Sequence, residues 1–258
     1  MHDYGSGDGP DDGLTSLRWS MGELVGLDFE TTGVDRCGDV PVSFAIVRAV
    51  GGVVVDRLAD LVDPGREIPP AATAIHGITT ERARTSGRPL AEVLALIADH
   101  VVDAGRRGIP VVGMNVSYDL TMLDHHLRLL EGEGLAGRGW RGPVLDVLVL
   151  DRHYDRYRRG KRKLEHLCRH YCVSVDSPHD AGADAEAAIA VLGAICGRYP
   201  ELHAIGLEEL TRLQCEWHRE WAVHYDLWRR GSGQGPLGPD EFEWPLAPRP
   251  EAAAPAAV

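Results

Sequence analysis

Three apolar segments follow one another closely near the start of the chain. Residues 24–30, 40–50 and 53–62 are rich in branched apolar side chains, and the first of them alternates apolar with acidic residues at its end. Runs of this length and composition are typical of β-strands. Gly51-Gly52 separates the second run from the third and is typical of a tight hairpin turn. The pattern therefore predicts three consecutive strands, of which the last two form a hairpin.

Helical and strand-like segments alternate through the following part of the chain. The stretch up to Thr79 contains Pro and Gly and is interpreted as a loop. Beyond it we expect a helix, two short strands that each run straight into a helix, and a last helix that is apolar on nearly all sides. The expected segments are residues 90–102, 109–113, 117–130, 144–146 and 183–195. This order predicts an α/β fold with a mixed sheet flanked by helices.

Both ends of the chain are poor in branched apolar residues. Residues 1–20 are rich in Gly and Asp, and residues 231–258 are rich in Gly, Pro and Ala, so neither buries enough apolar surface to offset the entropy of ordering. We expect a disordered N-terminal tail, a domain over residues 21–200, a helical extension over residues 201–230 and a C-terminal tail. Within that tail, the short apolar patch at residues 242–246 could fold back on the domain.

Composition narrows the class of protein. The chain has 258 residues, of which 44% are hydrophobic and 26% charged, as in a globular protein large enough to fold around its own core. No apolar run approaches the roughly 20 residues that span a bilayer, and residues 1–13 do not resemble a signal peptide. Five scattered cysteines, an odd number, indicate reduced thiols rather than a disulfide framework. We therefore expect a cytoplasmic protein with no membrane partner.

The acids of the first strand share one face. A formal net charge of −12 disfavours a protein that coats nucleic acid by bulk electrostatics, but it permits a site where carboxylates gather around cations. Successive side chains of a strand alternate, so Asp28 and Glu30 project together while Leu27 and Phe29 point the other way. The plain alternative is a strand that leaves the core with a solvated polar face.

Two further acids lie where helices are expected to begin. Asp119 follows a short apolar strand, at the carboxyl end where open α/β sheets place their sites. Alternatively Asn115, Ser117 or Asp119 itself caps or charges the start of the helix. Asp184 lies within an apolar helix start and needs a partner or a metal, because burying an unpaired carboxylate is costly. Asp180 could serve as a helix cap, whereas Asp184 lies too far into the helix.

These clusters, together with His179, resemble the three motifs of the DnaQ-like 3′-5′ exonucleases of the DEDD superfamily, in the subgroup that carries a histidine. The matching residues, in order, are Asp28-x-Glu30 followed by Thr31-Thr32-Gly33, then Asn115-x-x-x-Asp119, then His179-x-x-x-x-Asp184. The resemblance covers about residues 22–198 and is strengthened by Ile75-His76-Gly77-Ile78-Thr79. The sister subgroup has a tyrosine at the position of Asp180, and many relatives have a histidine in place of Met114.

The resemblance implies an RNase H-like domain that hydrolyses nucleic acid from its 3′ end and releases nucleoside 5′-monophosphates. It implies that two Mg²⁺ or Mn²⁺ ions are held by four carboxylates, those of Asp28, Glu30, Asp119 and Asp184. Hard cations prefer oxygen ligands, and two of them can stabilise both the attacking and the leaving oxygen of a phosphodiester. His179, with an ordinary pKa of about 6.5, would accept a proton from the attacking water near neutral pH.

The same resemblance implies where and what the substrate is. It places the 3′-terminal nucleotide on the backbone around Phe29, Thr31 and Thr32, with His76 and Asn115 near the groove. For His76 the alternative is a histidine that bonds to its own loop. The expected substrate is nucleic acid with a free 3′ end, with single-stranded DNA favoured, although the 2′-hydroxyl is sensed by details that no motif reports. An exoribonuclease of this fold, or a non-catalytic module that binds a nucleic-acid end or a polymerase, are the alternatives, and a polymerase or repair partner is left open.

A basic run stands out in this acidic chain. Residues 152–163 contain seven basic residues and one acid, including both lysines of the protein. The run lies between the second and third motifs, and a protein acting on a polyanion needs a patch of opposite charge. We therefore expect Arg158, Arg159 and Arg162 to bind the phosphate backbone. A solvated helix end and loop is the usual alternative.

Two other clusters have more than one interpretation. His166-x-Cys168-x-His170-x-Cys172 contains zinc-ligand residue types, but alternate residues of a helix point in different directions, so a core stripe through Cys168 is favoured. In the C-terminal extension an apolar stripe recurs at helical spacing. It is made of Leu210, Leu213, Trp217, Trp221, His224 and Trp228. This stripe predicts a helix packed on its own domain, with a platform for a partner or nucleic acid as the alternative.

Overall fold

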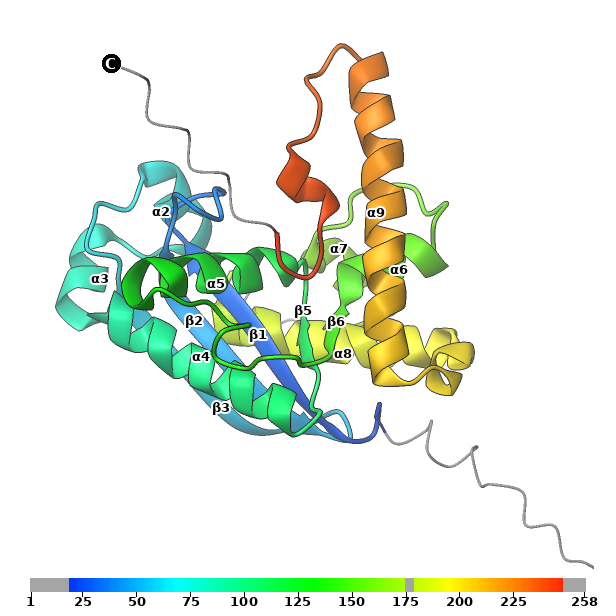
Figure 1. Ribbon diagram of the computed structural model, residues 1–258, viewed down its shortest axis with the longest axis horizontal. Coiled ribbons are helices and arrows are strands. Elements are labelled where there is room, and N and C mark those ends of the chain that lie inside the picture. The colour runs from blue at the N-terminus through cyan, green and yellow to red at the C-terminus, as the bar shows by residue number, and fades with distance from the viewer. Residues whose placement is uncertain (1–18, 175–178, 248–258) are drawn as a thin grey trace, which may run out of the picture.

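The computed structural model describes residues 19–174 and 179–247. Most of the predicted N-terminal tail, residues 1–18, lies outside these residues, as do residues 175–178 and 248–258. The centre of the protein is a six-stranded sheet with the strand order β4-β3-β2-β1-β5-β6 (Figure 1). The predicted mixed sheet flanked by helices is therefore confirmed.

The first three strands form the predicted antiparallel meander, and the remaining strands run parallel to their neighbours. Gly51 and Gly52 make the hairpin turn with φ of 58° and 78°, the left-handed region that glycine adopts at little cost. The strands are β1 (Glu23–Thr31), β2 (Pro41–Val50), β3 (Val53–Asp63), β4 (Arg88–Pro89), β5 (Val111–Gly113) and β6 (Val144–Asp146).

Helices cover both faces of the sheet (Figure 1). On one face, α4 (Leu90–Arg106) and α5 (Ser117–Glu131) bury apolar side chains against the alternate β1 residues Val25, Leu27 and Phe29. On the other face, α8 (Ala181–Arg198) packs on the same strands through a second core. Because side chains alternate along β1, its acidic residues Asp28 and Glu30 belong to the α8 face.

The stretch interpreted as a loop before Thr79 contains a helix, and a second follows it. The two helices are α2 (Pro70–His76) and α3 (Thr80–Ser86). Thr79 caps α3, since its hydroxyl accepts the Arg82 N–H at 3.1 Å. Each helix is only 7 residues long. Such short helices show too few apolar repeats for a periodic pattern to identify them.

The C-terminal part adds helices beside β6. They are α6 (Val147–Tyr154), α7 (Leu164–Tyr171), η1 (Pro200–Ala204), α9 (Leu207–Gly231) and η2 (Pro239–Phe242). The start of α9 packs on the domain as predicted, through the fully buried Leu210 and through Trp217. Its far end projects from the body (Figure 1) and leaves Trp228 56% exposed. The apolar stripe of α9 is thus buried along only part of its length.

Both predicted tails contain residues that pack on the domain. Trp19 is buried, and its indole N–H donates to the Ile205 carbonyl at 3.1 Å, so this end of the expected N-terminal tail is ordered. In the C-terminal segment Trp244 is buried, and the Ala247 N–H donates to Thr121 Oγ1 at 3.0 Å. The apolar patch at residues 242–246 therefore folds back on the α4–α5 face.

Two of the remaining sequence interpretations are settled by the helices. In α7 the buried residues are Leu167, Cys168 and Tyr171, which is the core stripe rather than a zinc site. All five cysteines are free thiols. Across residues 19–174 and 179–247, no helix combines the length and apolar character needed to cross a membrane.

Candidate active site

Three of the predicted acids meet where β1 and α8 touch. Gly26 permits the close approach, because a Cβ at this position would stand 2.9 Å from Ile189 Cδ1 and 3.1 Å from the Ala185 carbonyl oxygen of α8. Two and four residues further along β1, Asp28 and Glu30 project from the same face. The first turn of α8 carries Asp184 to these side chains.

His179 completes this corner of the site. One ligand atom each from Glu30, His179 and Asp184 lie within 4.8 Å of one another. The His179 N–H donates to Asp184 Oδ2 at 3.3 Å, which ties the residue before the helix to the acid inside it. Asp180 is the cap of α8, with its Oδ1 accepting the Ala183 N–H at 3.0 Å. The sequence-based division of roles between Asp180 and Asp184 is therefore confirmed.

Asp119 reaches the same acids from the other face of the sheet. It lies in the first turn of α5 and is 4% exposed. Its Oδ1 accepts the N–H of Phe29 from β1 at 3.0 Å. No side chain caps α5, whose N-cap is Val116, so the alternative in which Asn115, Ser117 or Asp119 caps the helix is wrong.

Burial and mutual repulsion raise the pKa of each of the four carboxyls. Burial is the largest cause for Asp28, and the charges of Asp119, Asp184 and Glu30 raise its pKa further. For Glu30, burial followed by the charge of Asp184 raises the pKa to about 8. Burial also raises the pKa of Asp119 and of Asp184, although backbone hydrogen bonds oppose the rise in both. The charges acting on Asp28 and Glu30 are all negative, so a cation would stabilise their ionised forms.

This donor set fits a divalent metal ion. The groups that converge are carboxylates with one imidazole, and hard cations such as Mg²⁺ and Mn²⁺ prefer oxygen ligands. A carboxylate without a positive partner is costly to bury, and a bound cation would remove both the desolvation and the repulsion that raise these pKa values. Asp28, Glu30, Asp119 and Asp184 are thus the residues that would hold metal.

Two predicted site residues have a backbone conformation that is uncommon outside glycine. Asn115 and His179 have φ of 61° and 65°, in the left-handed region. Such conformations cost free energy and are frequent where a side chain has to be aimed at a site. Asn115 is exposed, and its N–H is fixed by Asp146 Oδ1 at 2.9 Å.

The residues predicted to hold the terminal nucleotide are largely engaged inside the protein. The N–H of Phe29 is bonded to a carboxylate, as described above. Thr32 is 2% exposed, and its N–H donates to the Val40 carbonyl at 3.0 Å. The Thr31 hydroxyl donates to the Gly33 carbonyl at 2.6 Å. Phe29 and Thr32 therefore do not offer their backbone N–H groups to a substrate.

His76 lies next to His179. Both residues line a cavity of about 260 Å³. His76 Nδ1 accepts the Ile78 N–H at 3.1 Å, so its own loop does engage the ring, while Nε2 is buried without a hydrogen-bond partner among the described residues. Burial lowers the pKa of His76. With Nδ1 acting as acceptor, Nε2 carries the proton of the neutral ring and is a free donor.

Two of the three arginines predicted to bind phosphate need correction. The side chains of Arg158 and Arg162 are only 10% and 16% exposed. Both pair with Asp151, whose side chain is fully buried, and Arg158 Nη2 lies 2.7 Å from its Oδ2. The Tyr171 hydroxyl donates to Asp151 Oδ1 at 3.0 Å. Their charge is used to neutralise a buried carboxylate, whereas Arg159 remains exposed.

Sequence reasoning missed Asp146, which supports the second motif. It is 1% exposed, and its Oδ1 accepts the N–H groups of both Asn115 and Leu148 at 2.9 Å. Its own N–H donates to Gln214 Oε1 at 2.8 Å. One carboxylate thus caps α6 and holds the loop before α5. An acid within the apolar run of residues 144–150 was the available signal.

Comparisons with known proteins agree with this geometry. The exonuclease family model, RNase_T, matches residues 25–192, more than half of the chain. A PolC-type DNA polymerase III of Lacticaseibacillus paracasei is 32% identical over 165 residues, which are 64% of this chain and 11% of that protein. A DNA polymerase III subunit epsilon-like protein of Rhodobacter capsulatus is 35% identical over 136 residues, 49% of this chain and 17% of that protein. The chain thus spans less than a fifth of either relative.

Solved structures share the fold. The zinc-bound form of an E. coli exonuclease I complex with single-stranded DNA superimposes with a TM-score of 0.60 and 22% identity, over 77% of this chain and 43% of that one. The matched region of the family model, residues 25–192, contains Asp28, Glu30, Asp119 and Asp184. The chain belongs to the exonuclease family.

Proposed function

We propose that this protein is a metal-dependent 3′-5′ exonuclease that acts on single-stranded DNA and releases nucleoside 5′-monophosphates. The observation that carries the proposal is the convergence of four carboxylates and one histidine where β1, α5 and α8 meet. Membership of the exonuclease family supports hydrolysis at a strand end. A non-catalytic binding module has no need for buried acids whose repulsion costs stability, so the geometry disfavours that alternative.

The four carboxylates would hold two Mg²⁺ or Mn²⁺ ions. Such ions neutralise charge on the phosphate oxygens and make water acidic enough to act as a nucleophile near neutral pH. Glu30 and Asp184 lie nearest His179, whereas Asp119 approaches from α5 and is aligned by the Phe29 N–H. Acids on separate elements can thus contact the scissile phosphate from different sides.

His179 would act as the general base. Its ring nitrogen lies within 4.8 Å of carboxylate oxygens of Glu30 and Asp184, and the side chain is exposed, so it can reach a water beside the acids. An imidazole with an ordinary pKa of about 6.5 accepts a proton efficiently near neutral pH. His76, with a free Nε2 donor in the shared cavity, would bond to the substrate backbone.

DNA is favoured over RNA by the company that this sequence keeps. The matched relatives carry the names of DNA polymerase III proteins, and the superimposed exonuclease I structure contains single-stranded DNA. The same names favour a DNA polymerase as a partner of this chain. Co-purification with a tagged replicative polymerase, compared with a sample lacking this chain, tests that association.

The direct test is digestion of end-labelled substrates. Single-stranded DNA, matched and mismatched duplex DNA, and RNA should be compared with Mg²⁺, with Mn²⁺ and with EDTA. We expect 5′-monophosphate release from the 3′ end of single-stranded DNA, and none in EDTA. Products that shorten from the 5′ end, or equal activity in EDTA, would contradict the proposal.

Variants at the site sharpen that test. Asp119→Asn should lower turnover by at least about 10³-fold, since it removes charge that metal binding needs. His179→Ala should slow hydrolysis by about 10²- to 10⁴-fold and flatten the acidic limb of the pH–rate profile. Asp180→Asn is the matched control, because asparagine caps a helix as well as aspartate does. Comparable losses in all three variants would mean that fold, not chemistry, is being measured.

A further inference from the structure

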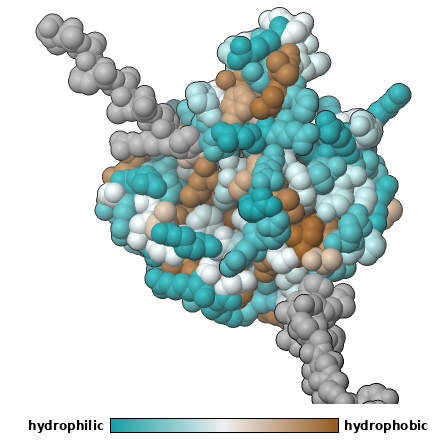
Figure 2. All heavy atoms as spheres, turned by 45° about the vertical axis from the view of Figure 1, so that its right-hand side comes forward, coloured by the Kyte–Doolittle hydropathy of each residue, from teal (hydrophilic) through white to brown (hydrophobic). Residues whose placement is uncertain are grey.

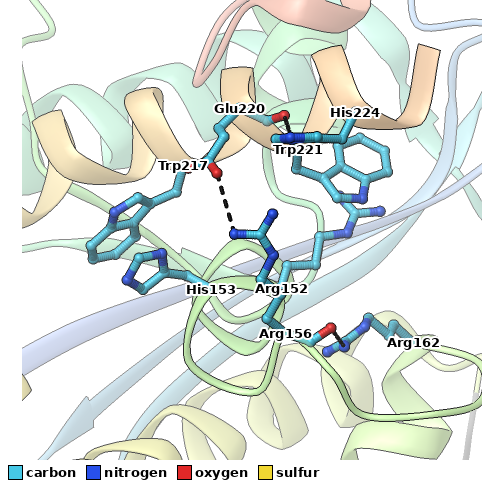
Figure 3. A pocket seen from close by; sticks show the side chains of 8 residues that line it. All are labelled: Arg152, His153, Arg156, Arg162, Trp217, Glu220, Trp221 and His224. Atoms are coloured by element: carbon cyan, nitrogen blue, oxygen red, sulfur yellow. Dashed lines mark hydrogen bonds and ion pairs between the residues drawn. The ribbon is translucent and has the colours of Figure 1, made fainter. Parts of the chain in front are cut away.

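A second cavity lies between α6 and α9, outside the acid site. Its volume is about 300 Å³. Arginine, histidine and tryptophan side chains from the two helices face one another across it (Figure 3). The side chains that matter most are Arg152, His153, Arg156, Trp217, Glu220 and Trp221. None of them has a role in the proposed chemistry.

Arg152 has hydrogen-bond donors to spare. Its guanidinium carbon lies 3.4 Å from the ring centroid of Trp221, and Figure 3 shows the group beneath that ring. Within residues 19–174 and 179–247 the guanidinium has no hydrogen bond or salt bridge, unlike Arg158 and Arg162. Burial lowers the pKa of Arg152 to about 10, which still leaves it charged at neutral pH. A half-buried cation with free donors is suited to an anion.

A second arginine is held only weakly. Arg156 pairs with Glu220 at 3.3 Å across the cavity, and both side chains are 53% exposed. Exposed pairs of this kind contribute about 0–1 kcal/mol, so a phosphate could replace the carboxylate. Two arginines would then face the same anion.

Aromatic rings extend from the cavity along α9. Trp217 stacks on His153 with centroids 3.8 Å apart. Trp221, Tyr225 and Trp228 form a row of nearly parallel rings, with successive centroids 5.0 and 5.6 Å apart. Figure 2 shows apolar side chains among hydrophilic ones on the projecting part of the molecule. Flat rings beside arginines are the features with which proteins bind unpaired bases and their phosphates.

The cavity is connected to the acid site through α6. Asp146, at the start of this helix, bonds to the N–H of Asn115 in the second motif. Arg152 follows six residues later, about 9 Å along a helix. The charges of Arg152 and Asp146 act on each other, and that of Asp146 acts on Asp119.

We propose that this cavity, with the aromatic row of α9, binds single-stranded DNA upstream of the 3′ end that is being hydrolysed. Arg152 and Arg156 would bind a backbone phosphate, and the aromatic side chains would contact unpaired bases. The inference rests on the proposed exonuclease function, but its binding measurement does not need hydrolysis. A duplex would keep its bases paired and would gain only the phosphate contact.

The test compares long and short strands. Binding of single strands of about 16 and about 4 nucleotides is measured by fluorescence anisotropy in Ca²⁺ at several salt concentrations. Arg152→Gln/Arg156→Gln should weaken binding of the long strand by about tenfold or more and reduce its salt slope by about 1.4. Turnover of the short strand in Mg²⁺ should be unchanged. Arg219→Gln is the control, since Arg219 lies on α9 but pairs with Glu243 outside the cavity.

A change of opposite sign guards against a folding artefact. Glu220→Gln frees Arg156 and should tighten binding of the long strand, which partial unfolding cannot do. The proposal is overturned if the double variant matches Arg219→Gln in affinity and salt slope, or if Glu220→Gln leaves affinity unchanged or weaker. If wild-type protein hydrolyses neither strand, the proposed function fails, and the anisotropy comparison still decides whether this cavity binds DNA.

Discussion

Two groups of buried carboxylates in this protein differ in what surrounds them. Asp151 is fully buried but receives Arg158, Arg162 and the hydroxyl of Tyr171. Asp28, although equally shielded, has only acidic neighbours among the charges that act on it, and its pKa rises accordingly. The first arrangement is complete within the chain. The second requires a cation from outside.

The contrast separates structural acids from functional ones without reference to any motif. A buried carboxylate with two guanidiniums is neutralised during folding, and its charge is unavailable for chemistry. Carboxylates that repel one another reduce the stability of the metal-free protein, so their persistence indicates a ligand that offsets the repulsion. The surroundings of an acid therefore say more than its burial.

The largest expected effect comes from breaking the complete arrangement. Arg158→Gln should lower the free energy of unfolding by about 3–5 kcal/mol, because it leaves Asp151 buried with less compensation. Arg159→Gln, at an exposed neighbour in the same run, should stay within about 0.5 kcal/mol. Urea unfolding monitored by circular dichroism measures both. Equal stability of the two variants would remove the distinction drawn between these arginines.

This pair of arginines also marks where prediction from sequence stops. The acids of the three motifs could be identified because their spacing along a strand or helix fixes which way they point. The partners of Arg158 and Arg162 could not, since Asp151 is seven and eleven residues away across a turn, and only the fold decides that the run turns inward. A count of basic residues cannot distinguish a surface patch from an internal ion-pair network.

The remaining differences from the sequence-based expectations have similar causes. The strands and long helices were predictable from apolar period, whereas α2 and α3 are too short to show one. Trp19 was assigned to a tail because its neighbours are polar, yet one indole that packs and bonds to Ile205 is enough to order it. Asp146 was overlooked because its role depends on a loop 31 residues earlier in the chain.

A smaller effect should appear in the pH dependence of the metal-free protein. Burial and Asp184 raise the pKa of Glu30 from 4.5 to about 8, so the folded state retains a proton that the unfolded state releases. The stability from this group is complete below pH 4.5 and is lost as the pH rises to about 8. In EDTA the melting temperature should therefore fall between pH 6 and 8, and Glu30→Gln should reduce that fall. Mg²⁺ should raise the melting temperature more at pH 8 than at pH 6, and the reverse order would contradict a cation site here.

The smallest expected change is a gain. Asp28→Asn removes one charge from the repelling group without altering its volume, and in EDTA it should raise the free energy of unfolding by about 1 kcal/mol. The same variant should abolish nuclease activity and most of the stabilisation by Mg²⁺. Thermal melts with and without Mg²⁺ measure both effects. A loss of stability in EDTA would mean that the charge of Asp28 is compensated in the metal-free fold.

The hydrogen bond from the Phe29 N–H to Asp119 has a consequence for the entropy of binding. The two residues are 90 positions apart, and the bond joins β1 to the first turn of α5. It fixes the Asp119 side chain in one rotamer before any ligand arrives, so the freedom of this carboxylate is lost during folding rather than on binding. Ordering a mobile side chain at a binding site costs about 0.5–1.5 kcal/mol. Asp119 therefore offers its second oxygen, Oδ2, in an orientation that the sheet has already set.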